Sequence, residues 1–308
     1  MARIRVTHKT VYRYSEPVQF NEHRFICRPR DSHDLRLLDT GIAISPNATL
    51  RWIHDVFGNS VLLARFVDAA DELRFESTFL AEHYPADPEV DLIEPHAERL
   101  PFSYDASEVP DVARVSERQY ADPAHEVDAW VRAVRAQAGT DKTLDVLVAI
   151  THAIKAQFAY EARDEEGTRT PVQTLQLGRG SCRDFALLMM EAARSLGLAA
   201  RFVSGYLYDE SLLGADSGIV GGGATHAWVQ VYLPGAGWLP FDPTNGLIGG
   251  RNLIRVATAR DPSQAAPLTG SFVGRADAYL GMTVDVSVEV AVAAAVAPAP
   301  SPELQPAG

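Results

Sequence analysis

Cysteine and long hydrophobic runs are scarce in this 308-residue sequence. It has two cysteines, Cys27 and Cys182, and no hydrophobic run approaches the roughly 20 residues of a membrane-spanning helix. Two cysteines cannot build a disulfide framework and suit a reducing compartment. The first residues, Met1–Val6, alternate polar and apolar side chains like a strand and lack the apolar stretch of a signal peptide. We therefore expect a cytoplasmic protein with no membrane partner.

Positive charge is also scarce. Lys and Arg number 28 against 40 acidic residues, for a net charge of −12, and only three of the bases are lysines. This balance argues against nucleic acid or an anionic membrane as a partner. Residues 66–128 hold 17 acidic residues and four arginines. This acidic stretch is either a solvated face, which is the commoner case, or a docking surface for a protein partner.

Metal-binding patterns are missing as well. His23, Cys27 and His33 do not have the spacing of a zinc site, and Asp31 between them is typical of a turn. No loop carries the regularly spaced acids of a calcium site. We predict no metal and no organic cofactor.

The first hundred residues have the pattern of an antiparallel β-sandwich. Alternating or apolar runs separated by Pro, Gly and Asn turns predict strands at 3–14, 20–28, 37–45, 48–56, 60–66 and 73–83. Between Pro85 and Pro110, prolines become frequent among acidic residues, which is typical of a linker. We assign the sandwich and the acidic linker to residues 1–105.

Helices and further strands follow the linker. Apolar residues at helical spacing predict helices at 122–137, 143–157 and 182–196, the last ending at Gly197. Alternation predicts strands at 200–207, 224–233, 238–241 and 280–290. This order indicates an α+β domain over residues 106–290. The Ala- and Pro-rich residues 291–308 are expected to be disordered.

One segment combines a helix start with a cysteine. In Gly178-Arg-Gly-Ser-Cys-Arg-Asp184, Ser181 can cap a helix and Asp184 stands at the capping-box position, so Cys182 becomes the first helical residue. Unpaired N–H groups and the helix dipole at this position favour a thiolate. A thiolate there can attack a carbonyl carbon, and the same N–H groups can stabilise the oxyanion that forms.

A base and a carboxylate follow on two predicted strands. His226 begins the first strand, and Asp242 ends the second within Trp238-Leu-Pro-Phe-Asp-Pro-Thr-Asn245. A Cys–His pair oriented by a carboxylate is the thiol form of a catalytic triad. If Leu233 paired with Trp238, however, Asp242 would face Val229 and point away from His226. The triad therefore requires a bulge or an odd loop length, for which Pro234-Gly-Ala-Gly237 supplies the glycines.

Three ordered blocks, 178–190, 225–232 and 237–246, strongly resemble the Cys, His and Asp motifs of the transglutaminase-like superfamily. Tyr12-Arg-Tyr-Ser-Glu-Pro17, Arg28-Pro-Arg30 and Asp55-Val-Phe-Gly-Asn59 are similar to the region that precedes this core in bacterial members. The resemblance implies a papain-like α+β core with Cys182 as nucleophile, His226 as general base and acid, and Asp242 as the residue that orients the histidine. Such enzymes often use an aromatic or amide side chain in the oxyanion hole, for which Tyr160 and Gln176 are candidates.

The resemblance also implies attack on an amide or peptide carbonyl of a peptide or protein substrate. We expect a peptidase, an amidase or a peptide-type acyl transferase. Alternatives are a non-catalytic binding module that keeps the fold, a protein-glutamine γ-glutamyltransferase, and an arylamine acyltransferase that uses the same triad. Trp228 is a candidate substrate platform, although a buried core position suits a tryptophan on this strand better.

Overall fold

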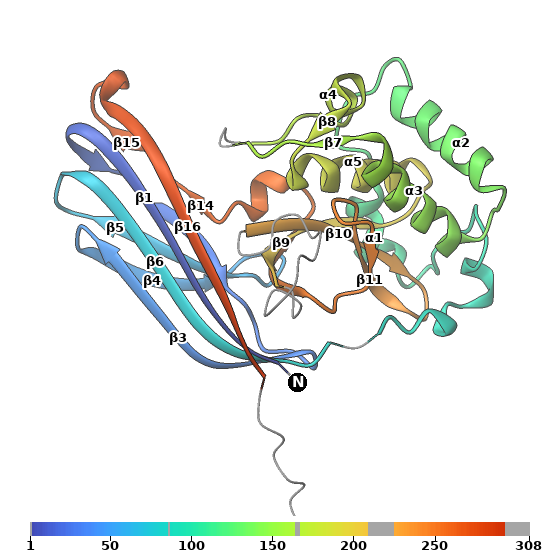
Figure 1. The fold of residues 1–308 in the computed structure, drawn as a ribbon, viewed down its shortest axis with the longest axis horizontal. Helices are drawn as coiled ribbons and strands as arrows, with labels where there is room; N and C mark the ends of the chain where they lie inside the picture. Colours follow the sequence, from blue (N-terminus) through green and yellow to red (C-terminus); the bar gives the residue numbers. More distant parts are fainter. Residues whose placement is uncertain (1, 86, 164–166, 209–224, 293–308) are drawn as a thin grey trace, which may run out of the picture.

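The N-terminal region is built from two antiparallel sheets. The structure is a computed structural model that describes residues 2–85, 87–163, 167–208 and 225–292 (Figure 1). The first sheet has the order β15-β1-β6-β3, with β16 also paired to β1. The second has the order β14-β2-β5-β4. The predicted β-sandwich is therefore present. Its strands are β1 (Ala2–Phe20), β2 (His23–Arg28), β3 (Leu35–Ser45), β4 (Ala48–His54), β5 (Ser60–Phe66), β6 (Ala70–His83), β14 (Leu268–Thr269), β15 (Phe272–Val273) and β16 (Tyr279–Val292).

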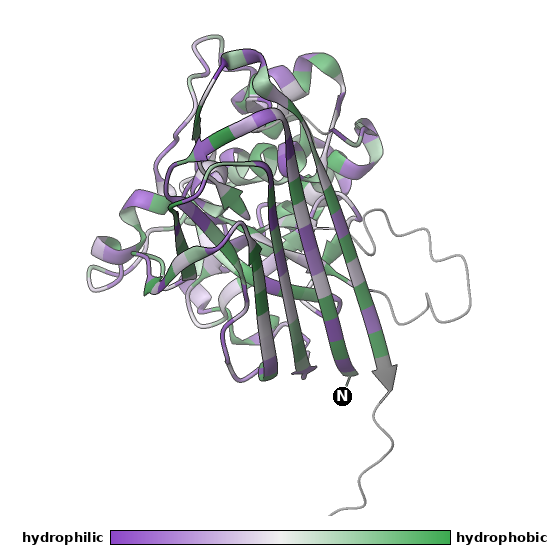
Figure 2. Ribbon diagram, turned by 90° about the vertical axis from the view of Figure 1, so that its left-hand side faces the viewer, coloured by the Kyte–Doolittle hydropathy of each residue, from purple (hydrophilic) through white to green (hydrophobic). Residues whose placement is uncertain are grey.

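Period-two alternation sets the two faces of the first sheet. In β1, Ile4 and Val6 are buried, whereas Arg3 and Arg5 point to solvent. Figure 2 shows the long strands of this sheet with hydrophilic and hydrophobic residues in alternation. A shift of one residue in the pairing of β1 with β6 would turn the apolar set outward, so burial fixes the register from Ala2↔His83 onward.

The C-terminal strands return to this N-terminal region. β16 runs antiparallel to β1 along nearly its whole length, from Ala2↔Val292 to Tyr14↔Tyr279. β14 pairs with β2, and β15 pairs with the end of β1. Residues 268–292 therefore complete the sandwich instead of closing the α+β unit to which the sequence pattern assigned them. Strand alternation predicted β16 itself but carried no information on its partner, because pairing between distant segments leaves no local signal.

The α+β unit packs helices on an antiparallel sheet of order β12-β11-β10-β9-β13. The predicted helices are found as α2 (Glu126–Ala138), α3 (Thr143–Gln157) and α5 (Cys182–Ser195). Two short helices, α1 (Val109–Ser116) and α4 (Pro171–Leu177), were not predicted. The strands are β9 (Ala200–Leu207), β10 (Thr225–Leu233), β11 (Gly237–Asp242), β12 (Leu247–Ile248) and β13 (Leu253–Ala259), with the two-residue pair β7 (Ala159–Tyr160) and β8 (Arg179–Gly180) beside α5.

The sandwich and the α+β unit share one hydrophobic core. Ile4 of β1 and Val61 of β5 belong to the same buried cluster as residues of α5 and β10. Polar contacts lock the junction: His8 Nδ1 lies 2.9 Å from the Tyr206 hydroxyl, and Asn59 exchanges two hydrogen bonds of 2.8 and 2.9 Å with the backbone of Thr258. The sandwich and the α+β unit therefore pack against each other through both apolar and polar contacts.

The proline-rich segment after β6 packs against the α+β unit. It contains two short 3₁₀ turns, Val90–Leu92 and Pro95–Ala97. The backbone N–H of Glu94 donates to the carbonyl of Pro234 at 2.9 Å, and the Tyr104 hydroxyl donates to the carbonyl of Tyr232 at 3.0 Å. A flexible tether would not bury Leu100 as this segment does. Among the described residues, no helix has the length and apolar character that spanning a membrane demands.

Candidate active site

The start of α5 is capped by a buried carboxylate. Asp184 Oδ2 accepts hydrogen bonds from the backbone N–H of Ser181 at 2.9 Å and from its hydroxyl at 3.0 Å. Gly180 makes this approach possible, because a Cβ on it would lie 2.9 Å from Asp184 Cβ and 3.1 Å from the Phe185 ring. Asp184 Oδ1 accepts a further bond from the backbone of Arg169 at 2.7 Å. The first turn of α5 is thus held from two sides.

Cys182 is the first residue of this helix and is half-buried. Its backbone N–H belongs to the first turn, where no intrahelical acceptor exists. The other cysteine, Cys27, lies fully buried between the two sheets of the sandwich. Burial raises the pKa of the Cys27 thiol to about 12, against smaller opposing effects of Ser77 and Arg28. The two thiols therefore occupy very different environments.

The hairpin of β10 and β11 brings His226 and Asp242 to the same face. Leu233 pairs with Gly237, so the connecting loop has the odd length that the triad requires. Phe241 then lies opposite Val229, and Asp242, one residue further, falls on the face of Trp228 and His226. Gly235 and Gly237 have φ of 83° and 75°, values that favour glycine. The turn chemistry of this loop thus decides where Asp242 points.

His226 and Asp242 form a buried pair. His226 Nε2 lies 2.9 Å from Asp242 Oδ2, and the two side chains are 1% and 0% exposed. Asp242 is further held by the side-chain amide of Asn245, which donates to Oδ2 at 2.8 Å, and by the backbone N–H of Thr244, which donates to Oδ1 at 3.0 Å. Burial alone would raise the pKa of Asp242, but His226 and Asn245 outweigh it and hold that pKa below its ordinary value.

Two neighbours set the charge of His226. Burial alone would lower the pKa of this imidazole, but the charge and hydrogen bond of Asp242, with a smaller contribution of the same kind from Cys182, raise it to about 10. Asp242 occupies Nε2, so Nδ1 is the ring nitrogen left for the thiol. Nδ1 is buried, and no described residue meets it in good hydrogen-bond geometry. Cys182 therefore lies near His226 in a looser contact than the one between His226 and Asp242.

The three further predicted site residues lie in different surroundings. Tyr160 pairs with Gly180 across β7 and β8, and its pKa is raised by partial burial and by the nearby Cys182, against an opposing effect of Arg183. The amide of Gln176 donates to the Glu126 carboxylate of α2 at 2.9 and 3.2 Å, which engages its donor away from the cysteine. Trp228 is 1% exposed and stacks on the His226 ring with 6.2 Å between centroids. It supports the histidine from the core side.

Asn245 is a site residue that the sequence reasoning did not identify. Its side chain and its backbone N–H both donate to Asp242, and Lys155 of α3 holds its carbonyl at 2.6 Å. The order Asp242-Pro-Thr-Asn245 is typical of a turn in which an aspartate accepts bonds from the following backbone. That signal was visible, but it does not say that the same carboxylate also faces a histidine.

Several acidic residues of the 66–128 stretch form ion pairs with arginines. Glu82 pairs with Arg3, Asp87 with Arg251, and Asp128 with Arg118, at N–O distances of 3.0, 2.9 and 2.7 Å. These pairs lie on β6, on the proline-rich segment and on α2. Within residues 2–85, 87–163, 167–208 and 225–292, no cluster of three or more His, Cys, Asp or Glu side chains could hold a metal ion.

Comparison with known proteins agrees with this architecture. Residues 128–243 match the model of the transglutaminase-like superfamily, and residues 4–82 match that of the bacterial transglutaminase-like N-terminal region. An uncharacterised protein of Mycobacterium leprae is 28% identical over 290 residues, covering 93% of this chain and 99% of that protein. One of Mycobacterium tuberculosis is 29% identical over 292 residues, covering 92% of each.

A crystal structure of a candidate cysteine protease from Cytophaga hutchinsonii has the same fold. It superposes with a TM-score of 0.67 at 19% identity, covering 96% of this chain and 92% of that one. The fold is therefore that of the papain-like thiol enzymes, an α+β core behind a β-sandwich. More particularly, the chain resembles transglutaminase-like proteins of bacterial type in both of its parts, with the core match at residues 128–243 and the match to the bacterial N-terminal region at residues 4–82.

Proposed function

We propose that this protein is a thiol enzyme that cleaves or transfers acyl groups at amide or peptide bonds. The supporting observation is the buried 2.9 Å contact between His226 and Asp242, with Cys182 at the start of α5 beside the free ring nitrogen. Asp242 fixes the imidazole, His226 carries the proton, and Cys182 supplies the nucleophile. Non-catalytic modules have no need of a cysteine at a helix N-terminus next to a carboxylate-bound histidine.

The reaction begins with the Cys182 sulfur attacking the carbonyl carbon of the substrate. A C–S bond forms, and the carbonyl oxygen becomes an oxyanion. We assign its stabilisation to the backbone N–H of Cys182 and the hydroxyl of Tyr160, whose raised pKa keeps it a donor at neutral pH. His226 then gives its Nδ1 proton to the leaving amine, and the C–N bond breaks. The product of this half-reaction is an acyl thioester on Cys182.

An acceptor completes the cycle. Water or an amine attacks the thioester carbon while His226 takes a proton from it, and the C–S bond breaks to regenerate the enzyme. Water gives hydrolysis, and an amine gives transfer. We favour hydrolysis or peptide-type transfer over protein cross-linking. We assign the protein to the cytoplasm, in keeping with two free cysteines, and we keep the acidic 66–128 stretch as a secondary protein contact.

The activity is tested with the full chain and a mixed peptide digest, with and without dansylcadaverine, followed by mass spectrometry. New peptide termini that vanish in Cys182→Ala support hydrolysis. Incorporation of the amine at glutamine supports the γ-glutamyltransferase alternative, and turnover of acetyl-CoA with an arylamine supports the acyltransferase alternative. If the phenotype of a deletion strain is fully complemented by the Cys182→Ala chain, the protein is a binding module and the proposed enzymatic function is wrong.

A further inference from the structure

The two sheets of the sandwich separate at one edge. β3 ends the first sheet and β4 ends the second, so neither strand pairs with another described strand on its outer side. Between these edges lie a cavity of about 200 Å³ and, next to it, a wider one of about 600 Å³. Both are lined by Arg28 and Trp52, and we call them together the edge cleft. The wider volume falls in the range of roughly 300–1,000 Å³ that ligand sites occupy.

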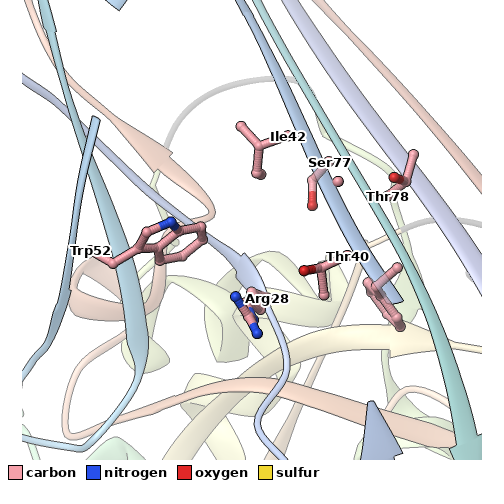
Figure 3. A pocket seen from close by; sticks show the side chains of 8 residues that line it. Arg28, Thr40, Ile42, Trp52, Ser77 and Thr78 are labelled. Carbon is pink, nitrogen blue, oxygen red and sulfur yellow. The ribbon is translucent and has the colours of Figure 1, made fainter. Parts of the chain in front are cut away.

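Arg28 is the main charge in the edge cleft. It ends β2 and is half-buried, and its guanidinium carbon lies 5.6 Å from the centre of the Trp52 ring (Figure 3). No hydrogen bond or ion pair joins the Arg28 guanidinium to another residue of the described chain. A guanidinium has five N–H donors in a fork that fits a carboxylate. The Trp52 ring thus positions Arg28, and no carboxylate of the described residues pairs with its guanidinium.

Besides apolar side chains, the remaining lining includes a second arginine and several hydroxyl groups. Arg30 and His54 line the wider cavity, and Thr40 and Ser77 line the smaller one. One acidic residue, Asp31, also lines the wider cavity, but its carboxylate already accepts the backbone N–H of Leu37 at 2.6 Å. The edge cleft therefore complements a negative group, in contrast to the net charge of −12 of the whole chain.

The walls of the edge cleft also suit a peptide backbone. An unpaired strand edge offers a row of free N–H and C=O groups to an added strand. On β4, Leu50 and Trp52 are 45% and 42% exposed, although both belong to the strand face that carries the cleft. An added strand with apolar side chains at alternate positions would cover them. A free anion such as phosphate would leave these groups uncovered.

We propose that the edge cleft is a docking site for an extended acidic peptide segment. The segment lies along the β4 edge. A Glu or Asp side chain opposite Trp52 points into the cleft and pairs with Arg28, and apolar side chains two residues to either side of it, on the same face, cover Leu50 and the Trp52 ring. The site is built from β2, β3, β4 and β6 and shares no residue with the proposed catalytic set. The proposal therefore stands or falls independently of the thiol chemistry.

Binding is measured by fluorescence anisotropy on the full chain carrying Cys182→Ala, so that no probe is cleaved. The probe is dye-labelled Ser-Val-Ser-Glu-Ser-Val-Ser, blocked at both ends, and its twin has Gln in place of Glu. We expect the Glu peptide to bind about tenfold tighter, the difference that a charge-assisted pair with guanidinium contributes. Arg28→Gln should abolish this preference, and Trp52→Ala, on an exposed strand that tolerates change, should weaken both peptides.

Arg51→Gln is the matched control. It also removes one positive charge, but from the position of β4 next to Trp52, where the side chain points to the strand face away from the edge cleft. Arg51→Gln should leave the affinity unchanged. Equal affinity for the Glu and Gln peptides, or equal loss in Arg28→Gln and Arg51→Gln, would overturn the proposal. Saturable binding of inorganic phosphate that displaces the peptide and requires Arg28 would assign the cleft to small anions and overturn it as well.

Discussion

Replacing Asp242 by asparagine changes one atom of the buried pair and tests how the site is held. Asp242 accepts four hydrogen bonds: Oδ1 from the backbone of Thr244 and Asn245, and Oδ2 from His226 and the Asn245 side chain. In Asp242→Asn the carbonyl oxygen can keep the backbone bonds. The new amide nitrogen then faces two groups that also donate. His226 can answer only by moving its proton to Nδ1, where the thiol proton must be received.

The magnitude follows from this geometry. The variant loses two acceptor bonds, one of them to a buried cation, and breaking such a pair from one side lowers the free energy of unfolding by about 3–5 kcal/mol. In a serine protease triad, the corresponding change of aspartate to asparagine leaves the histidine in the wrong tautomer and lowers the rate about 10⁴-fold. We expect any turnover that depends on Cys182 to fall by about 10²-fold or more.

Urea unfolding at pH 7 measures the stability change, and ¹⁵N NMR of the imidazole reports the tautomer. Asp87→Asn is the matched control, because it makes the same change in an exposed ion pair with Arg251 and should alter little. The difference between wild type and Asp242→Asn should shrink as the pH falls through the lowered native pKa of Asp242, and again as the pH rises through about 10, where His226 loses its proton. A variant as stable as Asp87→Asn, with an unchanged tautomer, would refute this reasoning.

Three further predictions concern the support of the site. At pH 8 the native chain should take up one equivalent of iodoacetamide and the unfolded chain two, because Cys27 is buried with its pKa near 12; equal labelling of both thiols in the native chain would contradict the packing. Burial lowers the pKa of His8 to about 4 in the folded state, so on acidification the unfolded state protonates this imidazole at a higher pH than the folded state does. The free energy of unfolding should therefore fall by up to about 3 kcal/mol between pH 7 and pH 4. His8→Gln should weaken that slope in urea titrations, and an unchanged slope would assign it elsewhere. Gly205→Ala should destabilise the chain by about 1–3 kcal/mol or more in thermal unfolding, since its Cβ would lie 2.0 Å from the Ile254 carbonyl oxygen, whereas Gly250→Ala, with 3.6 Å to Pro240, should not.

Local patterns predicted the elements well. The helix at 143–157 and the strand at 200–207 have the bounds that periodicity gave them, because an apolar stripe of that length satisfies one structure only. The start of α5 at Cys182 was also readable, since Ser181 and Asp184 form the cap locally. Short helices such as α4 escaped prediction because seven residues carry too little periodicity to distinguish them from a turn.

Long-range partners could not be read in the same way. The pairing of β16 with β1 depends on contacts between the two ends of the chain, and nothing near Tyr279 indicates them. The sequence showed that Asp242 faces His226 only if the loop between β10 and β11 has an odd length or a bulge. The length and the glycine conformations of this loop meet that condition, and neither could be read from the sequence. The edge cleft was missed because Arg28 and Trp52 belong to separate strands, and the sequence pattern of each is that of an ordinary strand residue.

The central claim is that His226 activates Cys182 as a nucleophile. The most direct measurement is the rate at which iodoacetamide alkylates Cys182 from pH 4 to 10. Peptide mapping separates this rate from that of the buried Cys27, which serves as the internal unreactive control. We expect labelling at pH 6 to be at least about tenfold faster than that of a free thiol, whose pKa is about 8.5, and we expect His226→Ala to lose this advantage. A rate that follows the free thiol, or falls below it, and is unaffected by His226→Ala would contradict the account.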